Sequence, residues 1–133
     1  MSIDTLSRTV RISQDITARS AVSVADTSPY VITTKHADAI PVPHGANNFV
    51  LTSDEHTAAN DTITGTVVGW PAVSGVGKPC DTFSFTASSN MKSSSTKYSA
   101  TTIKIIDVTG LAYIYPYVDT VSAGAPNLKG YFI

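Results

Sequence analysis

The segment DTFSFTA at residues 81–87 alternates apolar side chains with hydroxyl side chains. Successive side chains of a β-strand point to opposite faces of the sheet, so Phe83 and Phe85 share one face and the residues between them share the other. The first face suits a protein core, and the hydroxyl face suits water. This alternation predicts a half-buried β-strand.

Similar short runs of β-branched and aromatic residues recur along the chain, separated by Gly, Pro, Asn, Asp and Ser, and helical periodicity is almost absent. About nine strands are expected, too many for one flat sheet in a chain of 133 residues. The sequence therefore predicts an all-β fold: a two-sheet β-sandwich or jelly-roll-like domain over residues 21–133, preceded by an N-terminal arm or first strand over residues 1–20. The expected strands are residues 5–12, 20–25, 29–36, 48–53, 62–70, 81–87, 101–108, 111–118 and 128–133.

The segment TTIKIIDV at residues 101–108 departs from simple alternation. Ile103 and Ile105 set one phase, and Ile106 and Val108 set the other. A β-bulge would absorb this change of phase, and a strand buried on both faces would tolerate it. We expect a bulge.

Residues 88–100, SSNMKSSSTKYSA, form a serine-rich segment that is long for a hairpin loop. Such a composition does not support a core of its own. We expect a mobile loop or a contact arm.

The surface of this chain must be poor in charge. Hydrophobic residues make up 42% of the sequence, but charged residues make up only 14%, against about 25% in typical soluble domains. Serine and threonine take the places that lysine and glutamate usually occupy. Short hydroxyl side chains lose little rotamer entropy when they are covered, so such a surface suits burial against a partner. The net charge of −1 provides no field that would attract nucleic acid.

Cys80 is the single cysteine, which excludes an intramolecular disulfide. The first residues lack an apolar run of signal-peptide length, and no run of about 18 apolar residues occurs anywhere. We expect a soluble chain, made inside the cell, that binds no membrane.

The sequence contains little material for catalysis or metal binding. His36, His44 and His56 lie in separate segments, so a metal site would depend on a fold that the sequence does not reveal. Asp54 and Glu55 are adjacent and would point to opposite faces of a strand, which is unsuitable for a glycosidase pair. We expect no catalytic residue, no metal and no cofactor.

Three tyrosines, Tyr113, Tyr115 and Tyr117, alternate with small or aliphatic residues in GLAYIYPYVDT. The aliphatic side fits the core, so the tyrosine side is expected to be at least partly outside. Pro116 lacks a backbone donor, which predicts an edge strand or a bulge. Tyrosine combines a large ring with a hydroxyl group, and the strip therefore fits a protein interface, a sugar or a second small cluster beneath the serine-rich segment.

Trp70 is the only tryptophan. Carbohydrate-binding modules commonly expose two or three coplanar aromatic rings, and Trp70, Tyr113 and Tyr115 are the candidates for such a platform. The alternative is that Trp70 anchors the core or a loop.

Both ends of the chain carry residues suited to contacts. All three arginines, Arg8, Arg11 and Arg19, lie in the first twenty residues, and their fixed fork of donors suits an arm that reaches a neighbouring subunit. The last residues include Tyr131 and Phe132, which we expect to be tied into a sheet or against another subunit.

The extended start MSIDTLSRTVRIS, the Ser/Thr-rich strands DTITGTVVGW and DTFSFTASS, and the apolar end GYFI give the chain an overall character that resembles the small decoration, or cement, proteins of tailed bacteriophage heads. The resemblance implies a virion protein that is made in the host cytoplasm. It also implies self-association, with a trimer favoured, and stabilisation of the capsid by clamping neighbouring subunits.

The first hypothesis is therefore a non-enzymatic capsid decoration protein. Its contacts would be Arg8, Arg11 and Arg19, the tyrosine strip, Tyr131 and Phe132. The alternative is a carbohydrate-binding β-sandwich module, such as one belonging to a phage tail or fibre.

Overall fold

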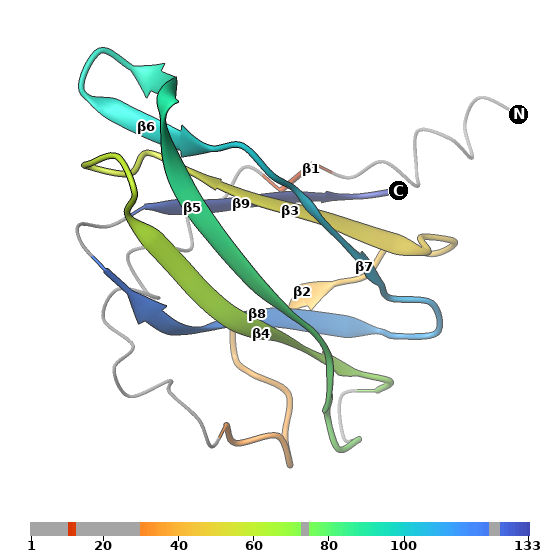
Figure 1. The fold of residues 1–133 in the computed structure, drawn as a ribbon. Coiled ribbons are helices and arrows are strands. Elements are labelled where there is room, and N and C mark those ends of the chain that lie inside the picture. Colours follow the sequence, from red (N-terminus) through yellow and green to blue (C-terminus); the bar gives the residue numbers. More distant parts are fainter. Residues whose placement is uncertain (1–10, 13–29, 73–74, 123–125) are drawn as a thin grey trace, which may run out of the picture.

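The computed structural model describes residues 11–12, 30–72, 75–122 and 126–133 (Figure 1). In these residues, nine strands form two antiparallel sheets, one of four strands and one of five. The sheets lie over each other as two layers (Figure 1). The prediction of an all-β, two-sheet sandwich is confirmed.

The five-stranded sheet has the order β2-β8-β4-β5-β6. Its central strand β4 matches the predicted range of residues 62–70 and is paired with β8 on one side and β5 on the other. The strands are β2 (Ile40–Pro41), β8 (Tyr113–Val121), β4 (Thr62–Trp70), β5 (Lys78–Ser94) and β6 (Lys97–Ala100).

The four-stranded sheet has the order β1-β9-β3-β7. Strand β3 is central for most of its length, because β9 pairs with one side and β7 with the other. The strands are β1 (Arg11–Ile12), β9 (Asn127–Phe132), β3 (Asn48–Asp54) and β7 (Lys104–Asp107).

The main core lies between the two sheets. Phe83 and Phe85 are buried in it, as the alternation of DTFSFTA predicted, with ring centroids 5.6 Å apart. Phe49 of β3 and Phe132 of β9 meet from the other sheet, with centroids 5.0 Å apart. Each strand contributes every second side chain, because the pleat directs alternate residues to the same face.

Two expected elements differ from the structure. Residues 30–36 form no strand, although residues 29–36 were predicted to form one. The serine-rich segment is not a loop, because it forms the end of β5 and the whole of β6. These two strands make a hairpin that extends from the body (Figure 1). The expected strand at residues 20–25 and most of residues 1–20 lie outside the described residues.

The bulge predicted near Ile106 is wrong. The pairing of β7 with β3 is uninterrupted, with Ile106 and Val108 buried and Ile103 and Ile105 exposed. Alternation is therefore kept, and the apparent change of phase arose because both faces of β7 carry isoleucine. The register shifts lie elsewhere. Cys80 of β5 and Asp119 of β8 each have no counterpart in β4, and the pairing of β5 with β6 is irregular between Ala87 and Ser94.

Pro116 was expected in an edge strand or at a bulge, but β8 is the second strand of its sheet and Pro116 pairs in register with Val67 of β4. Strand β8 has β4 along one side, but on the other side it meets only the two-residue strand β2, which pairs with Tyr113 and Ile114. Pro116 lies beyond the end of that short ladder, so its missing N–H group leaves no partner of β2 unsatisfied.

Candidate functional site

The tyrosine strip lies on the outer side of the five-stranded sheet, opposite the core side that holds Ile114 and Val118. Tyr115 and Tyr117 nevertheless have exposed fractions of only 1% and 5%. Together with Val68 and Trp70 of β4 they form a second buried cluster. The strip is therefore covered within the same chain.

The cover is formed by residues 30–39, which we call the strap. The Tyr30 ring stacks on Tyr117 with centroids 4.4 Å apart. The His36 imidazole stacks on Tyr115 with centroids 3.8 Å apart. Tyr115 and Tyr117 also meet edge to face, at 5.0 Å. Stacked and edge-to-face aromatic pairs typically contribute about 0.5–1.5 kcal/mol each beyond burial of their area.

Hydrogen bonds fix the strap to the sheet. The Trp70 indole Nε1 donates to the Ile32 carbonyl at 3.2 Å, and the same carbonyl accepts the Gly77 backbone N–H at 2.8 Å. The Tyr117 hydroxyl donates to the Val31 carbonyl at 3.4 Å. The strap therefore uses its carbonyl groups to satisfy aromatic donors, where a strand would use them in a ladder.

These positions correct several sequence-based predictions. Tyr115 and Tyr117 are not partly outside, whereas Tyr113 is half-buried beneath Lys35, whose Nζ lies 5.0 Å from the ring centroid. Trp70 has an exposed fraction of 0%, so Trp70, Tyr113 and Tyr115 form no open sugar platform. The expected second cluster exists, but the strap covers it and the serine-rich segment does not.

The predicted contacts at the chain ends have different outcomes. Arg8 and Arg19 lie outside the described residues. The backbone of Arg11 pairs with Tyr131 in the four-stranded sheet. Tyr131 is 40% exposed, so its role as a contact stays a prediction. Tyr131 and Phe132 are tied into a sheet, as one of the two expected alternatives, because β9 pairs with β3. Phe132 points into the core and is completely buried, so its assignment as a subunit contact is wrong.

One serine–histidine pair is present, but it is sealed from solvent. Ser53 Oγ lies 2.8 Å from His56 Nε2, and both residues are fully buried. The His56 Nδ1 atom has no hydrogen-bond partner. Burial lowers the pKa of His56, and the carboxylates of Asp61 and Asp54 oppose this shift. A serine that no substrate can reach does not act as a nucleophile, so the pair serves the fold.

No group of three or more His, Cys, Asp and Glu side chains within the described ranges is placed to hold a metal ion. His36 is stacked on Tyr115, and its Nδ1 accepts the Asp38 backbone N–H at 3.0 Å. His44 lies instead in a loop between β2 and β3. The structure does not bring the three histidines together.

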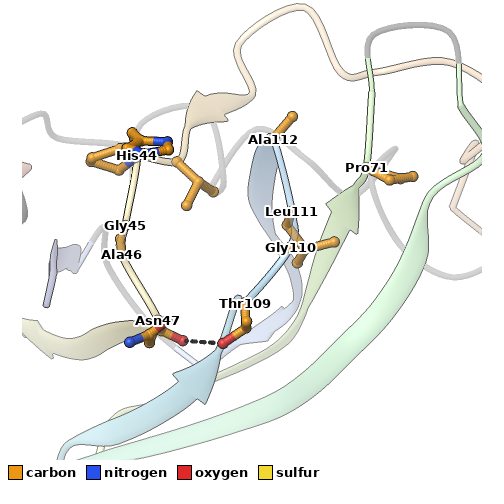
Figure 2. A pocket seen from close by; sticks show the side chains of 11 residues that line it. His44, Gly45, Ala46, Asn47, Pro71, Thr109, Gly110, Leu111 and Ala112 are labelled. Atoms are coloured by element: carbon orange, nitrogen blue, oxygen red, sulfur yellow. Dashed lines mark hydrogen bonds between the residues drawn. The ribbon is translucent and has the colours of Figure 1, made fainter.

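A cavity of about 450 Å³ opens at one end of the sandwich, between the loop before β3 and the loop before β8 (Figure 2). His44 and Pro71 stand on opposite sides of it, and the Thr109 hydroxyl donates to the Asn47 carbonyl at 3.5 Å (Figure 2). Among the described residues that line it, His44 is the only titratable side chain, and aliphatic groups form most of the remaining wall. These lining residues suit an uncharged group and contain no acid–base pair.

The strap covers the outer side of the five-stranded sheet, whereas apolar side chains are exposed on the outer side of the four-stranded sheet. Ile103, Ile105 and Tyr131 are 60%, 55% and 40% exposed. We call the surface formed by Ile103, Ile105 and Tyr131, with the buried Val50 between the last two, the open face. Sequence reasoning missed both isoleucines, because it explained their phase by a bulge, although the alternation itself contained the signal.

The end of the β5–β6 hairpin, residues 88–97, is the second exposed feature. Residues 89–96 are all exposed, and Lys92 is the only charged residue among them. The base of this hairpin end is fixed by a β-bridge between His56 and Tyr98. The Ser93 hydroxyl donates to the Glu55 carboxylate and accepts its backbone N–H, both at 3.3 Å. The hairpin end therefore projects as an ordered element.

In the part of the chain that the structure describes, no helix is long and apolar enough to cross a membrane. Comparisons of the chain with protein-family models, with curated proteins and with solved structures found no match.

Proposed function

We propose that the chain is a non-enzymatic virion structural protein that decorates a phage capsid and stabilises it by clamping neighbouring subunits. The observation that carries the proposal is the projecting hairpin end with its exposed, hydroxyl-rich residues 89–96. Its side chains lose little rotamer entropy on burial, and covering them removes only the charge of Lys92 from water. An ordered projection of this kind suits insertion between partner subunits.

The burial of the aromatic residues favours the hypothesis of an assembly protein over that of a carbohydrate-binding module. The platform that a sugar would need is part of the interior, because Trp70 and Tyr115 are buried under the strap. The carbohydrate hypothesis therefore loses the residues on which it depended. Capsid subunits and further copies of the chain are the proposed partners, in the virion after synthesis in the host cytoplasm.

Co-sedimentation tests the proposal. The purified protein is mixed with expanded heads of the phage whose genome encodes it, and the bound fraction is measured after pelleting. We expect saturable binding and a higher temperature of head disruption. Met91→Asp, which adds a charge to the exposed hairpin end, should weaken binding by about tenfold or more, or about 1.4 kcal/mol.

Val76→Asp is the matched control, because Val76 is also an exposed apolar residue but lies outside the hairpin. It should bind heads like the unchanged protein. The proposal is wrong if the protein does not pellet with heads. If both variants bind equally well, the hairpin is not the contact.

A further inference from the structure

We propose that the open face of the four-stranded sheet joins two copies of this chain around a two-fold axis. This inference goes beyond the proposed function, because contact between copies requires no capsid. It also uses a surface on β3, β7 and β9, whereas the capsid contact was assigned to the hairpin end.

The first argument is the apolar row across the sheet. Val50 of β3 pairs with Ile105 of β7 on one side and with Tyr131 of β9 on the other. Ile103 precedes Ile105 by two residues and shares its exposure. Val50 itself is buried, with an exposed fraction of 5%, so the exposed apolar surface is that of the residues on either side of it. Exposed apolar side chains that gather on one face mark interaction sites, whereas single scattered ones need no explanation.

The second argument is the contrast between the two sheets. The outer side of the five-stranded sheet carries aromatic residues that the strap covers, so Tyr115 and Tyr117 are buried. Among the described residues, no such segment covers Ile103, Ile105 and Tyr131. The open face therefore retains apolar area whose burial would contribute about 25 cal/mol per Å².

The third argument is the distribution of charge around the row. Asp107 of β7 pairs with Asn48, and Lys129 of β9 pairs with Thr52. Asn48 and Thr52 lie two residues to either side of Val50 on β3. The exposed Asp107 and Lys129 therefore occupy opposite corners of the same face, with the apolar row between them.

Opposite charges at opposite corners make the face complementary to itself. A two-fold axis in the plane of the contact, passing over Val50, exchanges the corners and places each Lys129 against Asp107 of the partner subunit. The apolar rows then cover each other, as an isologous contact requires. If the face bound a different partner with charges of a single sign, both corners would carry the opposite charge.

Both charged groups have partners in their own chain and would share their polar atoms with the second copy. Lys129 Nζ lies 3.0 Å from the Asp54 carboxylate, and an ammonium group has three donors. Asp107 Oδ1 accepts the Thr109 backbone N–H at 2.9 Å, and a carboxylate has about four acceptor positions. Each group can therefore serve its own chain and the partner together.

The solution mass of the protein, measured by light scattering and sedimentation at up to about 100 μM, is the first test. We expect a dimer, whereas the sequence favoured a trimer. Ile105→Lys should give a monomer with an unchanged circular dichroism spectrum. Val31→Lys, at another exposed apolar residue, should remain a dimer.

A charge exchange tests the two-fold geometry itself. Asp107→Lys alone and Lys129→Glu alone should each weaken the dimer by about tenfold or more, because each places like charges together. Mixing the two variants should restore it, since both contacts of the mixed dimer again join opposite charges. This recovery does not depend on the stability of either variant.

Several results would overturn the inference. These are a monomer or a trimer of the unchanged protein, a dimer that survives Ile105→Lys, and a mixture that does not recover. If the protein is monomeric and Ile105→Lys abolishes binding to heads, the open face is a capsid contact. None of these results decides the hairpin proposal, which Met91→Asp tests separately.

Discussion

The imidazole of His36 lies flat against the ring of Tyr115, with ring centroids 3.8 Å apart and ring planes 8° apart. His36 comes from the strap, which has no regular secondary structure, and Tyr115 comes from the middle of β8. Their contact closes a layer of aromatic rings on the outside of the five-stranded sheet. The tyrosine strip is consequently an internal structural element. The candidate contact surfaces, the open face and the hairpin end, lie on other strands.

Tyr115→Ala should destabilise the fold strongly. The ring is buried between His36 and Tyr117, so the change removes two ring contacts and leaves a cavity. We expect a loss of about 3–5 kcal/mol in the free energy of unfolding, as for other large aromatic residues in cores. Urea unfolding followed by circular dichroism measures it. Tyr131→Ala, at an exposed position, should cost less than about 1 kcal/mol.

The single tryptophan should report a buried environment. Trp70 is fully buried, and its indole donates to the Ile32 carbonyl. We therefore expect blue-shifted fluorescence that acrylamide quenches poorly in the folded protein and efficiently in urea. Added oligosaccharides should not change the spectrum. Efficient quenching in the folded state would show that the strap does not cover Trp70.

The stability of the protein should fall in mildly acidic solution because of His56. Burial lowers the pKa of this imidazole from the usual 6.5. Below pH 6.5 His56 takes up a proton in the unfolded chain, whereas in the folded protein its imidazole stays neutral until the pH is lower. The stabilising contribution is therefore complete above that pH and is lost as the pH falls towards the folded-state pKa, by at most about 1.4 kcal/mol per pH unit.

Urea unfolding between about pH 7.5 and pH 5 measures this effect, since most carboxylates remain ionised in that range. An NMR titration that gave His56 a pKa above 6.5 would contradict the prediction.

Gly65→Ala should be among the most damaging single changes. A Cβ atom at Gly65 would lie 2.0 Å from the Tyr117 carbonyl oxygen and 2.5 Å from Phe83 Cζ. The first of these atoms is backbone within a sheet and cannot move away alone, so we expect a loss of about 3 kcal/mol or more.

Gly75→Ala is the control for that substitution. Its Cβ would come no closer than 3.3 Å to Pro71 Cγ, so the neighbouring ring needs to move only slightly. Thermal unfolding compares the two variants. Similar midpoints for Gly65→Ala and the unchanged protein would show that β4 and β8 separate easily at the bulge.

The sequence located best the strands in which apolar and polar residues alternate because only one face is buried. Residues 62–70 coincide with β4, and Phe83 and Phe85 point inward as expected. The period of two is a local property of the backbone, and one buried face is enough to make it visible. The strap was misassigned because its β-branched residues favour a strand, yet no neighbouring strand pairs with it.

The candidate surfaces depended on information that alternation does not contain. The sequence placed the tyrosines on the side of β8 away from the main core, and this is correct. Whether that side met water was decided by the strap, which is separated from β8 by more than seventy residues of sequence. The opposite case is Ile103 and Ile105, whose phase the sequence analysis explained by a bulge, but which lie on an exposed side of the sheet.

The sequence by itself determined the all-β class, the number of layers and most inward-facing side chains, because these follow from backbone periodicity and from the need to bury apolar groups. Only the tertiary structure decided which outer side of the sandwich is covered, because that depends on contacts between residues far apart in the chain. The strap closes the aromatic side through ring stacking and hydrogen bonds. The isoleucine side has no equivalent cover among the described residues, so it is the side proposed to meet a second copy.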